Sequence, residues 1–177
     1  THLTFSPTGD LLVCCGRDGA TRLWDLATDR TVLTQPGGLA KRFGMDGRRL
    51  AYDRDTLGVG IWELLRSEVY QTFRMTDAQP EPVEEIAFSP DGRLLTWTDA
   101  DGFCWLEIES GQVNRRTMRK VYSVQFHPSG QSLFTGGFDG LRQWRVISST
   151  NANARQWQWQ FEPMQTLVEP NPIVDLD

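Results

Sequence analysis

The side chains best suited to metal or acid–base chemistry are few in this sequence and lie far apart. Its two histidines are His2 and His127, and its three cysteines are Cys14, Cys15 and Cys104. A zinc site needs three or four such ligands close together, and the spacing predicts no cluster of that kind. We expect no metal site, and we expect the cysteines to be reduced thiols packed as small apolar groups. That use of cysteine favours a reducing compartment, the cytoplasm.

Motifs for nucleophilic catalysis or phosphate binding are also missing from the sequence. It has neither a Gly-x4-Gly-Lys-Ser/Thr loop nor a Gly-x-Ser-x-Gly elbow. Asp99 and Asp101 lie two residues apart, but they fall in a turn pattern, so we expect a turn role for them instead of a catalytic carboxylate pair. The sequence therefore predicts no catalytic residue, no cofactor and no enzymatic activity of its own.

The charge balance argues against a nucleic-acid binder. With 18 basic and 23 acidic residues, the 177-residue chain has a formal net charge of −5, whereas nucleic-acid-binding domains are typically basic. The one basic run, 115–120, is expected to be a solvated strand and turn, and the alternative is a contact with phosphate or an acidic peptide. No apolar run approaches the roughly 18 residues that a membrane helix needs, so neither nucleic acid nor membrane is an expected partner.

Four stretches of the sequence share one pattern, which consists of Phe-x-Pro-x-Gly, a short apolar run, Asp-Gly and a second apolar run. One copy is degenerate, and the anchors of the four copies are Phe5, Phe43, Phe88 and Phe126, at steps of 38, 45 and 38 residues. Proline presets φ for a turn and the following glycine accepts a positive φ, while Asp-Gly is a strong hairpin signal. With a weaker fourth stretch, each copy predicts four short antiparallel strands. His127 replaces serine before proline in the last copy, so we expect a turn role for it.

This pattern resembles the WD-repeat β-propeller family, whose repeats of about 40–45 residues each form a four-stranded blade. The resemblance covers essentially the whole chain and implies an all-β fold of about four blades, each a four-stranded antiparallel sheet. The expected blades are approximately 1–37, 38–79, 80–118 and 119–170, with the start of another blade at 171–177. Because the family usually closes with about seven blades, the resemblance implies an open arc of a longer array, of a type similar to bacterial tandem repeats.

The hydrogen-bonded chain that the family forms from His, Ser or Thr, Asp and Trp is incomplete here. The histidine is missing from every copy, and Leu106 takes the tryptophan position of the third. The residues that keep family positions are Asp18, Trp24, Trp62, Asp101, Thr135, Asp139 and Trp144. We expect the three aspartates to bond amides of their own hairpins, and only Asp139 to join a longer chain through Thr135 and Trp144.

Two further expectations concern the open ends of the arc and the segment between Val146 and Met164. There "QWQWQFE" alternates aromatic and polar residues and predicts a strand with Trp157, Trp159 and Phe161 on one face. That strand either covers its own blade or forms an exposed docking edge. The first and last sheets are each expected to expose an apolar face, so the isolated chain is expected to self-associate or to aggregate.

The resemblance implies a protein-interaction scaffold that binds another protein or peptide through loops on the rim. The residue before each hairpin aspartate should project near the central channel, and Arg17, Arg54 and Phe138 at those positions are types enriched at interface cores. Three alternatives remain open: a sensor attached to a catalytic domain such as a bacterial protein kinase, a small-ligand or enzymatic propeller with a site at the channel mouth, and a purely architectural segment.

Overall fold

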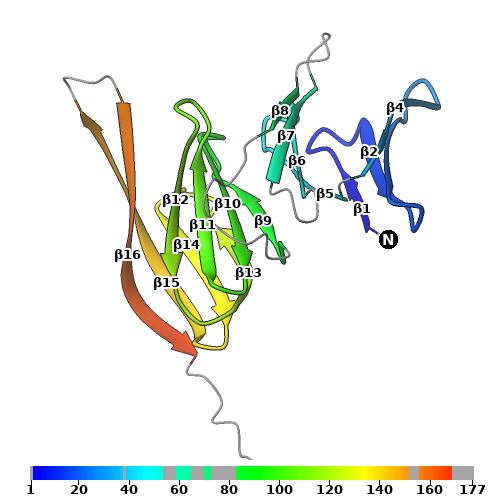
Figure 1. Ribbon diagram of the computed structural model, residues 1–177. Coiled ribbons are helices and arrows are strands. Elements are labelled where there is room, and N and C mark those ends of the chain that lie inside the picture. Colours follow the sequence, from blue (N-terminus) through cyan, green and yellow to red (C-terminus); the bar gives the residue numbers. More distant parts are fainter. Residues whose placement is uncertain are drawn as a thin grey trace, which may run out of the picture.

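The computed structural model describes residues 2–37, 39–53, 59–64, 70–72, 83–151 and 156–168, and all of its regular structure is β. The sixteen strands form four sheets, each a four-stranded antiparallel meander in chain order. Figure 1 shows the sheets side by side in an open arc, a partial β-propeller, with the N-terminal sheet at one end and the β13–β16 sheet at the other. No helix capable of crossing a membrane is found in these ranges.

The four sheets repeat one arrangement. The first contains β1 (His2–Phe5), β2 (Leu11–Cys15), β3 (Ala20–Asp25) and β4 (Arg30–Pro36). The second contains β5 (Leu39–Phe43), β6 (Arg49–Asp53), β7 (Val59–Glu63) and β8 (Tyr70–Thr72). The third contains β9 (Ile86–Phe88), β10 (Leu94–Asp99), β11 (Gly102–Glu107) and β12 (Gln112–Thr117). The fourth contains β13 (Val121–Phe126), β14 (Ser132–Gly137), β15 (Gly140–Asn151) and β16 (Gln156–Val168).

The first turn of each sheet is closed by the glycine that the repeat pattern predicts. Gly9, Gly47, Gly92 and Gly130 have φ values of 74°, 66°, 70° and 73°, a region that side chains with a Cβ rarely adopt. In the fourth sheet, the His127 ring accepts a hydrogen bond from the Ser129 amide at 3.2 Å, which confirms its expected turn role. The turns therefore place the first and second strands of every sheet in the same register.

Three apolar clusters hold the sheets together, one at each junction, as the alternation of the strands predicts. The cluster between the second and third sheets includes Ile61, Leu95 and Trp97, all nearly or fully buried. At each junction, the third-strand residue at the repeat's tryptophan position faces the preceding sheet: Trp62 in the second sheet, Leu106 in the third and Trp144 in the fourth. Burial of this apolar area is the main stabilising contribution to such stacked sheets.

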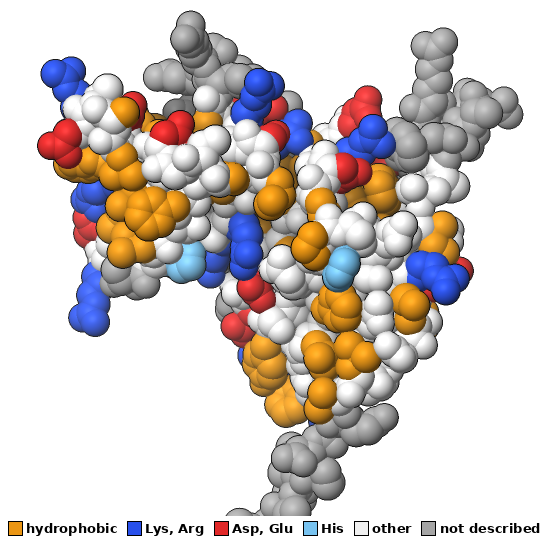
Figure 2. All heavy atoms as spheres, turned by 180° about the vertical axis from the view of Figure 1, so that it is seen from behind, with side chains coloured by type: hydrophobic (Ala, Val, Ile, Leu, Met, Phe, Trp, Pro, Cys, Tyr) orange, Lys and Arg blue, Asp and Glu red, His pale blue; other side chains and the backbone are white. Residues whose placement is uncertain are grey.

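The equivalent face of the first sheet has no described sheet in front of it. Leu3 and Phe5 are each 60% exposed there, and Trp24, the equivalent of Trp62, is 37% exposed. Figure 2 shows hydrophobic side chains gathered on this N-terminal sheet, at the left of the view. The expected apolar open face is therefore present at this end of the arc.

The opposite end differs from expectation, because the outward face of the fourth sheet is largely polar. Gln143 occupies the position of Leu23 and Ile61 in the first two sheets. Its side chain accepts a hydrogen bond from Gln165 at 2.9 Å and donates one to Ser132 at 3.1 Å. Polar side chains that bond one another need no covering sheet, so the predicted apolar face is found only in part at this end, where Leu141 and its partner Val168 are 36% and 58% exposed.

The predicted aromatic strand forms part of β16, which pairs continuously with β15 in the longest hairpin of the described residues. Phe161 is 2% exposed and packs edge-to-face on Phe103 and Trp105 of the third sheet, at ring centroid distances of 5.5 and 4.9 Å. The β15–β16 hairpin therefore completes the fourth sheet and also packs against the third sheet. The side chain of Trp157 and the expected start of a further blade at 171–177 lie outside the described residues.

Candidate interaction surface

In each sheet, an aspartate at or beside the second hairpin forms an ion pair with an arginine or lysine. These ion pairs occur where the family's hydrogen-bonded chain is incomplete. Asp18 pairs with Arg22 at 2.5 Å, and Asp53 with Lys41 at 3.0 Å. The Arg22 guanidinium, together with a hydrogen bond from the Ala20 amide, lowers the pKa of the Asp18 carboxyl to about 2.

The third and fourth sheets use different elements to supply the cation. Asp99 is 2% exposed and accepts two hydrogen bonds from Arg115 of β12, at 2.9 and 2.6 Å. Asp139 lies 3.7 Å from Arg142 of β15. A buried carboxylate needs such a partner, because an unpaired buried charge is strongly destabilising.

The hydrogen bonds expected of the hairpin aspartates are only partly found. Asp18 accepts a hydrogen bond from the Ala20 amide at 3.2 Å, as expected. At the third hairpin it is Asp99 that accepts from the amide of Asp101 at 3.0 Å, while the Asp101 side chain is 66% exposed and faces Arg115 at 3.9 Å. The expectation for Asp101 is therefore wrong, because the residue two positions earlier caps the turn.

The remnant of the family's chain in the fourth sheet consists of two residues instead of three. The Trp144 indole donates to the Thr135 hydroxyl at 2.8 Å in the buried core, which confirms that part of the prediction. Asp139 does not join them, since Arg142 three residues later occupies its carboxylate. Trp62, by contrast, is 2% exposed and stacks on Tyr52 at 4.5 Å.

The basic run at 115–120 is largely occupied by contacts within the molecule. Arg116 donates to the Phe161 carbonyl at 2.7 Å and lies over the Trp144 ring, and Lys120 forms an ion pair with Glu84 at 3.0 Å. These side chains tie β12 and the following turn to the neighbouring sheets. Arg116 and Lys120 of this run therefore serve mainly to connect neighbouring parts of the fold, and they do not form a freely exposed basic patch.

An exposed aromatic pair lies at the hairpin end of the fourth sheet. Phe138 and Tyr122 are 40% and 46% exposed, and their ring centroids are 5.7 Å apart. The Arg119 guanidinium lies over the Phe138 ring at 5.4 Å, and the Lys120 ammonium lies over the Tyr122 ring at 5.2 Å. Figure 2 shows hydrophobic side chains gathered at the lower end of the molecule, where the β14–β15 hairpin ends in Figure 1. We call Arg119, Lys120, Tyr122 and Phe138 the aromatic patch.

The aromatic patch borders a charged hollow where the innermost strands of the sheets meet. This hollow of about 240 Å³ is lined by His2, Lys41, Arg42, Glu84, Glu85, Ile86 and Tyr122. Glu85 bridges three sheets, because it accepts from Arg42 at 3.1 Å and from the Val124 amide at 3.1 Å. The charged side chains of the hollow therefore connect the innermost strands of neighbouring sheets.

The three predicted rim residues are not brought together. Phe138 belongs to the aromatic patch. Arg17 is exposed on the hairpin of the first sheet, with two sheets between it and Phe138. Arg54 lies outside the described residues. Sequence reasoning included Arg119 only as part of the basic run 115–120 and missed Tyr122, although the outward position of Tyr122 in "VYSVQF" was an available signal.

Metal ligation finds no support within the described ranges, which hold no group of three or more His, Cys, Asp or Glu side chains able to bind an ion.

In comparisons with known proteins, the family model described as WD40, "WD domain, G-beta repeat", matches residues 1–25 and 113–141. The first match covers β1–β3 of the first sheet, and the second runs from β12 of the third sheet through β13 and β14 of the fourth. No curated protein matches the chain.

Proposed function

We propose that this chain, two stretches of which match the WD40 repeat model, is a protein-interaction scaffold whose partner docks on the aromatic patch. Repeats of this family generally mediate protein–protein interaction, and the exposed aromatic side chains of the patch support it as the proposed docking surface. The observation that carries the proposal is the exposed Tyr122–Phe138 pair beneath the Arg119 guanidinium. Tyrosine and arginine are among the residue types that dominate binding energy at protein interfaces.

The patch is also held in place, which lowers the entropy lost on binding. The Phe138 amide donates to the Lys120 carbonyl at 3.0 Å, so the hairpin is fixed to the chain segment that carries Lys120. The Lys120 side chain is itself fixed by Glu84. A partner therefore meets preformed aromatic faces.

The chemistry of the patch selects the kind of partner. An apolar side chain of an extended peptide would cover the two rings, and an adjacent carboxylate would meet Arg119, whose charge lies over Phe138. Charge complementarity of this kind contributes more to specificity and association rate than to affinity. We therefore propose an apolar–acidic peptide segment as the partner, in a cytoplasmic setting.

A small-ligand site at the channel mouth is the second candidate, because the charged hollow adjoins the patch. Its cations already face carboxylates, with Lys41 on Asp53 and Arg42 on Glu85. That pairing favours a structural role for the hollow. If a catalytic domain such as a kinase is attached to the chain, the patch would serve as its partner-sensing part.

The test is selection of peptides from a random displayed library on the immobilised chain, followed by dissociation constants from fluorescence anisotropy. Phe138→Ala and Tyr122→Ala should each weaken the selected peptides at least about tenfold, the loss of a hot-spot side chain. Met45→Ala is the matched control, since Met45 is a 66% exposed apolar side chain on a turn of the second sheet. Peptides that bind equally well to wild type and to both aromatic variants would refute the proposal.

A further inference from the structure

The outer edge of β16 is the longest sheet edge in the described part of the chain. β16 is the last strand of the fourth sheet, so only its side towards β15 is paired. It has 13 residues, whereas the last strands of the other sheets, β4, β8 and β12, have 7, 3 and 6. Because the edge of a sheet presents backbone N–H and C=O groups to which another strand can add, proteins usually protect long edges.

One half of this edge is protected and the other half is not. Between Glu162 and Val168 the strand contains Pro163, which has no N–H to donate, and two register shifts against β15. Proline, β-bulges and charges are the usual means by which proteins prevent pairing at an edge. From Gln156 to Phe161 the register with β15 has no shift, and the sequence has no proline, glycine or charged residue there.

A contact from the third sheet marks the limit of the unprotected half. The Arg116 guanidinium donates to the Phe161 carbonyl at 2.7 Å, so this carbonyl faces away from β15. In an antiparallel sheet, alternate residues direct their backbone groups to the same side. The backbone groups of Trp159 and Trp157 therefore also face the outer edge. We call residues 156–160, which lie beyond the Arg116 contact, the edge segment.

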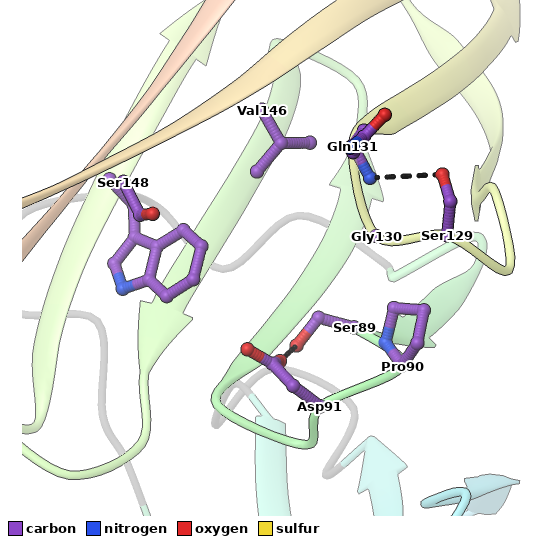
Figure 3. Close-up of a pocket in the computed structure, with 9 residues that line it drawn as sticks. Ser89, Pro90, Asp91, Ser129, Gly130, Gln131, Val146 and Ser148 are labelled. Carbon is purple, nitrogen blue, oxygen red and sulfur yellow. Dashed lines mark hydrogen bonds between the residues drawn. The ribbon is translucent and has the colours of Figure 1, made fainter.

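The hairpin departs from the third sheet in the region of the edge segment. A pocket of about 270 Å³ separates Val146, Ser148 and Trp159 of the hairpin from the first turns of the third and fourth sheets, 89–91 and 129–131. Figure 3 shows Val146 and Ser148 on one side of this pocket and the two turns on the other. In Figure 1 the end of the hairpin stands apart from the other sheets, at the upper left. This separation leaves room for a further strand beside the edge segment.

The sequence of the edge segment is self-complementary for antiparallel pairing. Residues 156–160 are Gln-Trp-Gln-Trp-Gln, which reads the same in both directions. Two copies paired about Gln158 place glutamine opposite glutamine and Trp157 opposite Trp159. Aromatic pairs across neighbouring strands are stabilising, whereas like charges are destabilising, and the segment has no charge. This register also leaves the Phe161 carbonyl to the third sheet.

We infer that two copies of this chain associate through their edge segments, about a two-fold axis at Gln158, and join their four-stranded fourth sheets into one sheet of eight strands. A two-fold contact of this kind is closed, so it produces a dimer and no fibre. The edge segment contains none of the residues of the aromatic patch, so each dimer presents two such patches. It is also distinct from the apolar face of the first sheet.

The test is sedimentation velocity of the whole chain with the substitution Phe5→Gln, which reduces association through the apolar face of the first sheet. This chain should still form a dimer with a measurable dissociation constant. Gln158→Lys and Gln158→Glu should each weaken that dimer at least about tenfold, because like charges then lie opposite one another at the axis. An equimolar mixture of the two variants should restore dimerisation, since opposite charges then meet.

Two control variants locate the effect. Gln112→Lys introduces the same charge at an exposed position of β12, the last strand of the third sheet, and it should leave the dissociation constant unchanged. Phe138→Ala should also leave it unchanged, so failure of this inference and failure of the proposed function are distinguishable. A Phe5→Gln chain that is monomeric at all concentrations would overturn the inference. Dimers that withstand Gln158→Lys, or a mixture that does not restore dimerisation, would overturn it as well. Gln158 is exposed, so these variants should fold, and circular dichroism checks this.

Discussion

Replacement of Trp144 by alanine should cause a large loss of stability, because this side chain links the third and fourth sheets. Trp144 is 3% exposed, and its ring meets that of Phe103 edge-to-face at 5.4 Å. Truncation of a buried tryptophan removes apolar contacts and leaves a cavity, which together cost about 3–5 kcal/mol. The free energy of unfolding should therefore fall by that amount.

Trp24 provides a matched control within the same chain. It occupies the equivalent position of the first sheet, but it is 37% exposed, because no described sheet covers that face. Trp24→Ala should lower the free energy of unfolding by about 1 kcal/mol or less, the usual range for a partly exposed site. The difference between the two variants thus measures the contribution of the covering sheet.

The substitution Trp144→Phe separates the contribution of the indole hydrogen bond to stability from that of the buried aromatic ring. Trp144→Phe leaves the buried Thr135 hydroxyl without its indole donor, and an unsatisfied buried group costs about 1–3 kcal/mol. Trp105→Phe is the comparison, since the Trp105 indole N–H is buried without a hydrogen-bond partner in the described part of the chain. That second variant should be the less destabilising of the two.

The assay is urea unfolding followed by far-ultraviolet circular dichroism, which avoids the fluorescence change that loss of a tryptophan produces. Measurements at low chain concentration keep self-association from stabilising either variant. A loss below about 1 kcal/mol for Trp144→Ala would refute the reasoning, because losses of that size are typical of surface sites. Equal losses for Trp144→Ala and Trp24→Ala would do the same, since the sheet junction would then contribute nothing.

Two further predictions concern the thiols and the open face. Iodoacetamide should modify Cys14 in the folded chain and should not modify the buried Cys15 and Cys104. Mass spectrometry of the treated chain measures which thiols have reacted. Burial raises the pKa of the Cys104 thiol from 9.0 to about 12. Because the unfolded chain loses this proton at lower pH than the folded chain, the free energy of unfolding should fall as pH rises from 9 towards 12. A urea midpoint that stays constant over that pH range would contradict this. The apolar face of the first sheet should cause concentration-dependent association in light scattering, and Phe5→Gln should reduce it while Gln165→Ala on the polar face does not. A monomer at all concentrations would show that the exposed face is tolerated in water.

The sequence was sufficient for the repeated unit, because its signals are local. Proline and glycine at fixed offsets from Phe5 and Phe126 determine the first turn through backbone sterics, and the glycines have the positive φ values that this requires. Alternating apolar residues determine which side of each strand is buried. The pairing of Trp144 with Thr135 followed in the same way, since the two residues lie on adjacent strands of one hairpin.

Tertiary structure alone decided which charges meet and which faces need a partner. The cations that hold Asp53 and Asp99 come from β5 and β12, respectively, and no spacing rule connects those strands to the hairpins. The polar outer face of the fourth sheet depends on Gln143 meeting Gln165, which required the register of β15 with β16. The burial of the Glu107 Oε1 atom, which has no hydrogen-bond partner in the described part of the chain, likewise depends on how the sheets pack. Long-range electrostatic pairs depend on distance and burial, which a linear pattern does not encode.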